Sequence, residues 1–190
     1  TVNSTGNIGY NIPNRTQGVG FSYKNFKHLL SESGLMIASD SFKVSNNLRI
    51  TSLSLAQKFL SKIPIKEVDP GSFSDFKATA QFWDTTMTND FVGVNVEQNV
   101  YAWNNPPNDK YIILEYKITN RTSDTIPNLY AGIFADWDIS KNGLDKAAWN
   151  HNEGFGYVYD AENKNIYAGI KPLLPYYGTY YAIENQATSV

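Results

Sequence analysis

The sequence predicts an all-β protein: an antiparallel β-sandwich, or an extended supersandwich, of about ten strands with little helix. Three observations predict it. Apolar and polar residues alternate with a period of two along much of the chain, as in strands that bury one face. Turn-forming Asn, Pro and Gly residues separate the alternating segments at short intervals. Aromatic residues make up 14% of the 190 residues and charged residues only 18%, a balance that excludes a disordered chain.

The clearest strands form a hairpin in the middle of the chain. Residues 91–103 alternate valines with small or polar residues, and residues 111–120 alternate apolar with mostly polar residues. Between them, residues 104–109 have the sequence Asn-Asn-Pro-Pro-Asn-Asp, which can turn a chain but cannot continue a strand ladder. We therefore expect residues 91–103 to pair with residues 111–120, and residues 128–139 to follow as the third strand of a meander.

Shorter alternating segments flank this meander. The segments expected to be strands are residues 18–23, 34–39, 42–50, 75–83, 156–160, 165–171 and 178–184. Helical patterns are scarce. Residues 53–63 fit either an amphipathic helix or a strand, and residues 145–150 fit one helical turn with Asp145 near its start.

The strand spacing favours one β-sandwich domain over residues 1–190. A chain of this length buries about 70% of its unfolded surface, so it can fold without a metal or a disulfide. Because Thr1 is not an initiator methionine and no signal-like leader follows it, we expect the chain to be a processed product or an excised domain; that it is excised from a longer secreted chain is implied by the family resemblance described below.

The composition excludes several classes of function. Lys and Arg number 16 against 18 Asp and Glu, so a nucleic-acid binder or an anionic-membrane binder acting through bulk charge is not expected. No apolar run reaches the roughly 18 residues of a membrane span. The absence of cysteine excludes disulfides, thiolate zinc sites and thiol nucleophiles.

A serine-type hydrolase is not expected from this sequence either. The only histidines are His28, which has no Gly-rich nucleophile turn nearby, and His151, which lies in a predicted loop, so both are expected to be ordinary surface residues. No Gly-x-Ser-x-Gly turn is present. We therefore predict that the isolated domain is non-catalytic and requires no cofactor.

The acidic stretch that ends the third meander strand carries the strongest chemical signal. If the chain is extended through residue 139, Asp136 and Asp138 share one face at a separation of about 6–7 Å. Two carboxylates that close repel each other unless a cation or hydrogen-bond donors hold them. Asn142 and Asp145 follow in a segment that can fold back, and oxygen ligands of this kind suit Ca²⁺. Asp136, Asp138, Asn142 and Asp145 are therefore the candidate calcium ligands.

Two other interpretations of these carboxylates stay open. The spacing is not that of a helix-loop-helix calcium site, because Lys141 and Ala147 stand where that site needs Gly and Glu. Asp136 and Asp138 would then cap a strand end by accepting hydrogen bonds from backbone and Asn donors. A pair of close carboxylates also forms the catalytic residues of glycosidases, so Asp136 and Asp138 could have a catalytic role.

Aromatic residues supply candidate binding positions. Four Trp and 13 Tyr could form a platform on which sugar rings stack, although a sandwich also needs aromatic side chains between its sheets. The residues singled out are Trp137, Trp149, Tyr176, Tyr177 and Tyr180, because they are close to the acidic stretch or lie in an aromatic, turn-like segment.

Five phrases together resemble a known family. They are residues 18–21 (GVGF), 29–37 (LLSESGLMI), 134–139 (FADWDI), 157–160 (YVYD) and 167–171 (YAGIK). From about residue 6 to residue 185, the chain resembles a region that follows the catalytic domain in long secreted subtilisin-like peptidases of Bacteroidetes. Those proteins usually end in a type IX secretion sorting tail. The peptidase motifs and the sorting tail do not occur in this sequence, so the resemblance carries over no catalytic residue.

The resemblance implies a non-catalytic accessory or binding β-sandwich domain of a secreted or cell-surface bacterial protein, whose parent chain is a subtilisin-like serine peptidase. Its partners would be the rest of the parent polypeptide and a polysaccharide or protein ligand. The alternative is a carbohydrate-binding or carbohydrate-active domain that uses Asp136 and Asp138 with the nearby aromatic residues.

Overall fold

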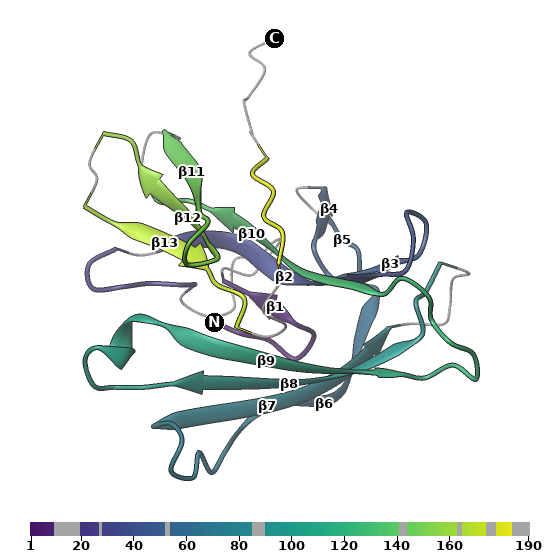
Figure 1. The fold of residues 1–190 in the computed structure, drawn as a ribbon. Helices are drawn as coiled ribbons and strands as arrows, with labels where there is room; N and C mark the ends of the chain where they lie inside the picture. Colours follow the sequence, from purple (N-terminus) through teal and green to yellow (C-terminus); the bar gives the residue numbers. More distant parts are fainter. Residues whose placement is uncertain are drawn as a thin grey trace. The chain divides into compact units, whose positions relative to one another are not determined.

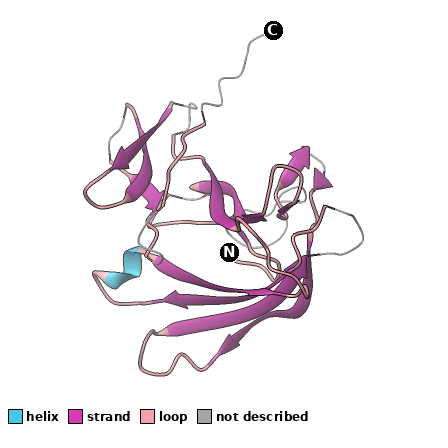
Figure 2. Cartoon of the chain, turned by 45° about the vertical axis from the view of Figure 1, so that its right-hand side comes forward, coloured by secondary structure: helices cyan, strands magenta, loops and turns pink. Residues whose placement is uncertain are grey.

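The structure is a computed structural model of residues 1–190. It describes residues 1–9, 20–26, 28–51, 54–84, 90–140, 144–162, 165–173 and 178–183. The chain divides into two compact units, Thr1–Asp136 and Trp137–Val190. The described residues form thirteen strands and one 3-10 turn, η1 (Asn108–Lys110), with no α-helix (Figure 2). Among them no helix is long and apolar enough to cross a membrane. The all-β prediction is therefore confirmed, while the prediction of a single domain stays a prediction.

The first unit contains a four-stranded antiparallel sheet in the order β6-β7-β8-β9 (Figure 1). Its strands are β6 (Phe59–Val68), β7 (Phe76–Asp84), β8 (Val94–Ala102) and β9 (Ile112–Asn120). The register of β8 with β9 runs unbroken from Val94 opposite Asn120 to Ala102 opposite Ile112. This confirms the central hairpin. In contrast, β6 carries two register shifts against β7.

A second sheet in the same unit has the order β1-β2-β10, with β3 also paired to β2. Its strands are β1 (Asn7–Ile8), β2 (Leu30–Ala38), β3 (Val44–Ser45) and β10 (Tyr130–Trp137). β4 (Arg49–Thr51) and β5 (Ser54–Leu55) follow β3 in the sequence and form a separate two-stranded hairpin. The hydroxyl of Ser33 on β2 donates to the carbonyl oxygen of Phe134 on β10 at 2.6 Å.

The core of the first unit lies between these two sheets. Its buried members come from β2, β6, β7 and β8 and the residues just before β8: Leu35, Ile37, Phe59, Phe82, Val92, Val94 and Val96. The rings of Phe59 and Phe82 pack with their centroids 5.0 Å apart. From Ala78 to Asp84 in β7 and from Val94 to Val100 in β8 every second residue is buried, because alternate side chains of a strand point to opposite faces. The period-two pattern in the sequence thus marks the face that each strand presents to the core.

The second unit contains a three-stranded antiparallel sheet in the order β11-β12-β13. Its strands are β11 (Asp145–Asn150), β12 (Phe155–Asp160) and β13 (Tyr167–Ile170). β12 is the central strand, and its register pairs Tyr159 with both Lys146 and Tyr167.

Several predicted elements differ from the structure. Residues 128–139 do contain a strand, β10, but it pairs with β2 and not with β9, so it is not the third strand of a meander. Residues 145–150 form strand β11 and not a helical turn, because they pair along their whole length with β12. Residues 178–183 lie in no strand, so the strand predicted over residues 178–184 is wrong for its described part. Within residues 53–63 the helix alternative is wrong: Ser54–Leu55 form β5 and residues 59–63 belong to β6, while residues 56–58 between them lie in no strand. Of the strand predicted over residues 18–23, residues 18 and 19 lie outside the described residues, and residues 20–22 lie in no strand.

Candidate functional site

Asp136 lies near the end of β10 and belongs to an ion-pair cluster of the first unit. Its Oδ2 accepts a hydrogen bond from Nη2 of Arg49 at 3.0 Å. The backbone N–H of Arg49 donates to Oε1 of Glu32 at 2.6 Å, and its Nε lies 3.4 Å from Oε2 of the same carboxylate. One guanidinium on β4 therefore holds two carboxylates, one from β2 and one from β10.

Glu32 is the buried member of this cluster. Its side chain is 6% exposed, whereas that of Asp136 is 26% exposed. Burial raises the pKa of Glu32 above its ordinary value of 4.5, and the charge of Asp136 acts in the same direction. The hydrogen bond from the Arg49 backbone and the positive charge of Arg49 act to lower the pKa, but burial is the largest effect.

The sequence did not identify Glu32 or Arg49 as partners of Asp136, although one signal was present. Glu32 is a charged residue in a strand whose neighbours are mostly buried, and buried charges need partners. The partner itself could not be predicted, because Arg49 is 87 residues away from Asp136 in the sequence.

The other predicted metal ligands lie in the second unit or outside the described residues. Asp145, at the start of β11, accepts hydrogen bonds from the backbone N–H groups of Ser140 at 2.7 Å and Ile139 at 3.3 Å. Asp138 is exposed, and Asn142 lies outside the described residues. Within the described part of the chain, no group of three or more His, Cys, Asp and Glu could hold a metal ion. The calcium site stays a prediction.

Two of the predicted aromatic residues are in contact. The rings of Trp149 and Tyr180 stack with centroids 5.5 Å apart and an interplanar angle of 11°. The Tyr180 ring also lies over Gly156, where a Cβ atom would be 2.3 Å from Cδ2 of the ring. Trp137, the last residue of β10, is half-buried. Tyr176 and Tyr177 lie outside the described residues.

A larger aromatic group lies on the sheet of the second unit. We call it the aromatic face; it consists of Phe155, Tyr157, Tyr159 and Tyr167. Consecutive rings have centroids 5.6, 6.1 and 5.6 Å apart, with interplanar angles of 15°, 34° and 28°. The Tyr167 side chain is 55% exposed, and the other three residues are half-buried. The face is therefore a connected row of rings that is partly accessible to solvent, most of all at Tyr167.

The sequence analysis missed the aromatic face, but its signal is in the period of β12. Aromatic residues occupy every second position, Phe155, Tyr157 and Tyr159, which places them on one side of a strand. Two of these positions and Tyr167 fall within the YVYD and YAGIK phrases that carry the family resemblance.

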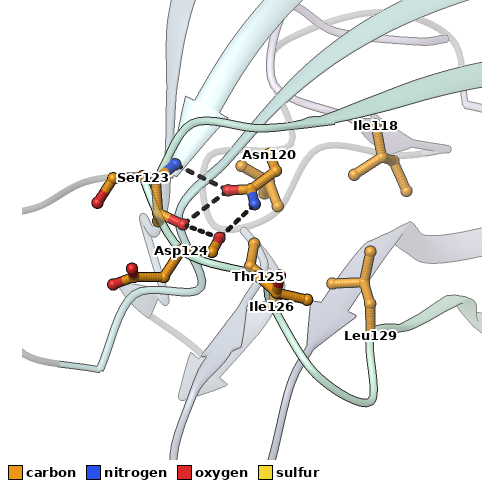
Figure 3. A pocket seen from close by; sticks show the side chains of 9 residues that line it. Ile118, Asn120, Ser123, Asp124, Thr125, Ile126 and Leu129 are labelled. Carbon is orange, nitrogen blue, oxygen red and sulfur yellow. Dashed lines mark hydrogen bonds between the residues drawn. The ribbon is translucent and has the colours of Figure 1, made fainter.

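A cavity of about 480 Å³ lies in the first unit, near the β9–β10 connection (Figure 3). Its polar lining is largely occupied by local hydrogen bonds. Asn120 Nδ2 donates to the carbonyl oxygen of Asp124 at 2.7 Å, and Thr122 Oγ1 donates to the same oxygen at 2.8 Å. Asp124 is the one ionisable residue among the residues that line this cavity. None of the predicted site residues lines it.

Comparisons of the chain with models of protein families, with curated proteins and with solved structures gave no match.

Proposed function

We propose that this chain is a non-catalytic accessory domain that binds a ligand in a secreted or cell-surface bacterial protein. The observation that carries the proposal is the engagement of Asp136. Its carboxylate forms an ion pair with Arg49, which also holds Glu32. A residue used in this way ties three strands to one another, which favours a structural role for Asp136 over a catalytic one.

Two further observations support the proposal. The carboxylate of Asp145 accepts backbone hydrogen bonds in a turn, which is also a structural role. The aromatic face offers a surface for a ligand, since exposed aromatic rows in soluble proteins commonly mark binding sites. The extracytoplasmic setting and a parent subtilisin-like peptidase are supported by the five phrases quoted above, three of which lie in or beside β10, β12 and β13.

The proposal is tested by incubating the purified chain with casein and with soluble polysaccharides, and by measuring new amino termini and reducing ends. We expect no product above that of a mock purification. Hydrolysis by the wild-type chain that Asp136→Asn abolishes would contradict the proposal, provided that circular dichroism shows the variant to be folded. That result would favour the carbohydrate-active alternative, with Asp136 in a catalytic role.

A further inference from the structure

The strand register places the aromatic face and several hydrogen-bonding side chains on one side of the second unit's sheet. Residues that are directly opposite in neighbouring strands share a face. Tyr159 is opposite Lys146 on β11 and Tyr167 on β13, and Phe155 is opposite Asn150. The amide of Asn150 and the ammonium group of Lys146 therefore flank the row of rings along β11.

The two faces of this sheet differ in their apolar residues. Val158, Ala168 and Ile170 share one face with Trp149. The aromatic face holds no branched aliphatic side chain at any position of β11, β12 or β13; its remaining positions are Ala148 and Gly169. Aliphatic packing is thus confined to one side, and rings with hydrogen-bonding groups to the other.

Gly169 allows the Phe155 ring to lie close to the sheet. A Cβ atom at Gly169 would be 2.7 Å from Cζ of Phe155 and 2.2 Å from the carbonyl oxygen of Gly156. On the other side of the central strand, Tyr157 is opposite Ala148, a small residue. The Tyr157 ring also lies 6.1 Å from the Tyr167 ring, so the rings of β12 and β13 form one connected group.

This combination of groups matches the surface of a carbohydrate. A sugar ring presents patches of C–H groups, which pack against aromatic rings, and hydroxyl groups, which both donate and accept hydrogen bonds. Tyr hydroxyls can donate and accept, and Lys donates. Oδ1 of Asn150 already accepts the backbone N–H groups of Asn152 at 3.1 Å and Glu153 at 3.2 Å, so Asn150 contributes its N–H₂ group as a donor. Four rings in consecutive contact form a row longer than one ring, so the matching ligand is a chain of sugars.

We propose that the aromatic face binds an extended polysaccharide, with Tyr159 and Tyr167 as its central contacts. The proposal rests on the proposed function, because it names the ligand class of the binding domain. It assigns to binding a set of residues different from Trp137, Trp149, Tyr176, Tyr177 and Tyr180, the positions singled out from the sequence.

Affinity electrophoresis of the full 190-residue chain tests the proposal. Native gels would contain barley β-glucan, xylan, or polygalacturonate, so that both neutral and acidic chains are sampled. We expect at least one of them to retard the chain. Tyr167→Ala should raise the dissociation constant at least about tenfold, the loss expected for one aromatic contact at the centre of a binding site. Tyr159→Phe keeps the ring and should keep most of the retardation, whereas Tyr159→Ala should lose it.

Tyr130→Ala is the matched control, because Tyr130 is an exposed tyrosine of β10, 65% exposed against 55% for Tyr167. It should be retarded as strongly as the wild type. No retardation by any polysaccharide, or equal retardation of Tyr167→Ala and the wild type, overturns the proposal; a protein ligand for this face would give the first of these results. Absence of both retardation and hydrolysis removes this proposal and leaves the proposed function standing. Hydrolysis together with retardation that depends on Tyr167 removes the proposed function and leaves the polysaccharide site standing.

Discussion

The carboxylate of Asp84 accepts a hydrogen bond from the backbone N–H of Gly93 at 2.8 Å. The same carboxylate accepts from the N–H groups of Val92 at 2.7 Å and Val94 at 2.8 Å, and from the hydroxyl of Ser45 at 3.0 Å. Asp84 is 1% exposed. One buried side chain at the end of β7 therefore accepts hydrogen bonds from three successive N–H groups at the start of β8. Through Ser45 it also links β7 and β8 to β3.

Replacing Asp84 should strongly destabilise the first unit. Asp84→Ala leaves three backbone donors without their acceptor, and Asp84→Asn places an amide N–H₂ among donors. We expect either change to lower the free energy of unfolding by about 3 kcal/mol, because a buried group that loses a charged partner retains its desolvation penalty. Urea unfolding measures the change. Asp109→Asn removes the same charge from an exposed position of η1 and should change stability by less than about 0.5 kcal/mol.

β7, β8 and β9 could be predicted from the sequence because apolar and polar residues alternate along them. Burial alternates from Ala78 to Asp84 in β7 and from Val94 to Val100 in β8, and the Asn-Pro-rich segment between β8 and β9 fixes the turn. The full length of β6 could not be predicted in this way, because most of its residues are exposed and it has no buried face. β11 was predicted wrongly for a physical reason. Its sequence, DKAAWN, contains residues with good helix propensity, and only pairing with β12 makes it a strand. The helix or strand propensity of these residues carries no information about their pairing with a distant strand.

The candidate sites show a similar division. The period-two aromatic residues of β12 were visible in the sequence, but their neighbours Lys146 and Tyr167 depend on the register of three strands. The ion-pair cluster is even harder to predict from the sequence. Glu32 and Arg49 are 17 residues apart, and Arg49 and Asp136 are 87 apart, so only the topology of the first unit shows that they meet.

Glu32 should make stability depend on pH. Its pKa is raised in the folded protein, chiefly by burial. The folded state therefore binds this proton more tightly than the unfolded state, and Glu32's contribution to the free energy of unfolding falls as the pH rises from 4.5 through the raised pKa. In Glu32→Gln this titration is absent.

We therefore expect the stability of the wild type relative to Glu32→Gln to decrease as the pH rises above 4.5, and to become constant once the pH has passed the raised pKa of Glu32. Chemical unfolding at a series of pH values measures this difference. Glu67→Gln, which removes the same charge from an exposed position of β6, supplies the reference profile. A difference that rises with pH would contradict the prediction and would mean that the ion pair with Arg49 outweighs burial.

Gly169 should tolerate no side chain. Alanine there would place its Cβ atom 2.2 Å from the carbonyl oxygen of Gly156 and 2.7 Å from the ring of Phe155. We expect Gly169→Ala to destabilise the second unit by about 3 kcal/mol, as overpacking against backbone does, and to raise amide hydrogen exchange in β11–β13.

Gly132→Ala is the matched control for this change. Gly132 is also a strand glycine, in β10, but a Cβ atom there meets nothing within 4 Å. Its replacement should be neutral or slightly stabilising, because alanine restricts the unfolded chain. A change in stability for Gly169→Ala as small as that for Gly132→Ala would contradict the prediction and would show that movement of the sheet relieves the crowding at Gly169.

Asp145 should stabilise the turn before β11 whether or not calcium is present. Its carboxylate accepts the N–H groups of Ile139 and Ser140, and the hydroxyl of Ser140 accepts the N–H of Leu144 at 2.7 Å. Asp145→Ala removes the first two acceptor contacts. We expect a loss of about 1–2 kcal/mol, because both orphaned donors are partly buried.

Thermal melting in excess calcium and in excess chelator separates this role from metal binding. If the backbone contacts account for the effect, Asp145→Ala should lower stability equally in both conditions. If Ca²⁺ also binds at Asp136, Asp138, Asn142 and Asp145, the wild type should gain about 2.7 kcal/mol at a hundredfold excess of calcium over its dissociation constant. Asp138→Ala then decides the question: Asp138 is exposed, so its loss should abolish a calcium-dependent gain while changing stability in chelator less than Asp145→Ala does.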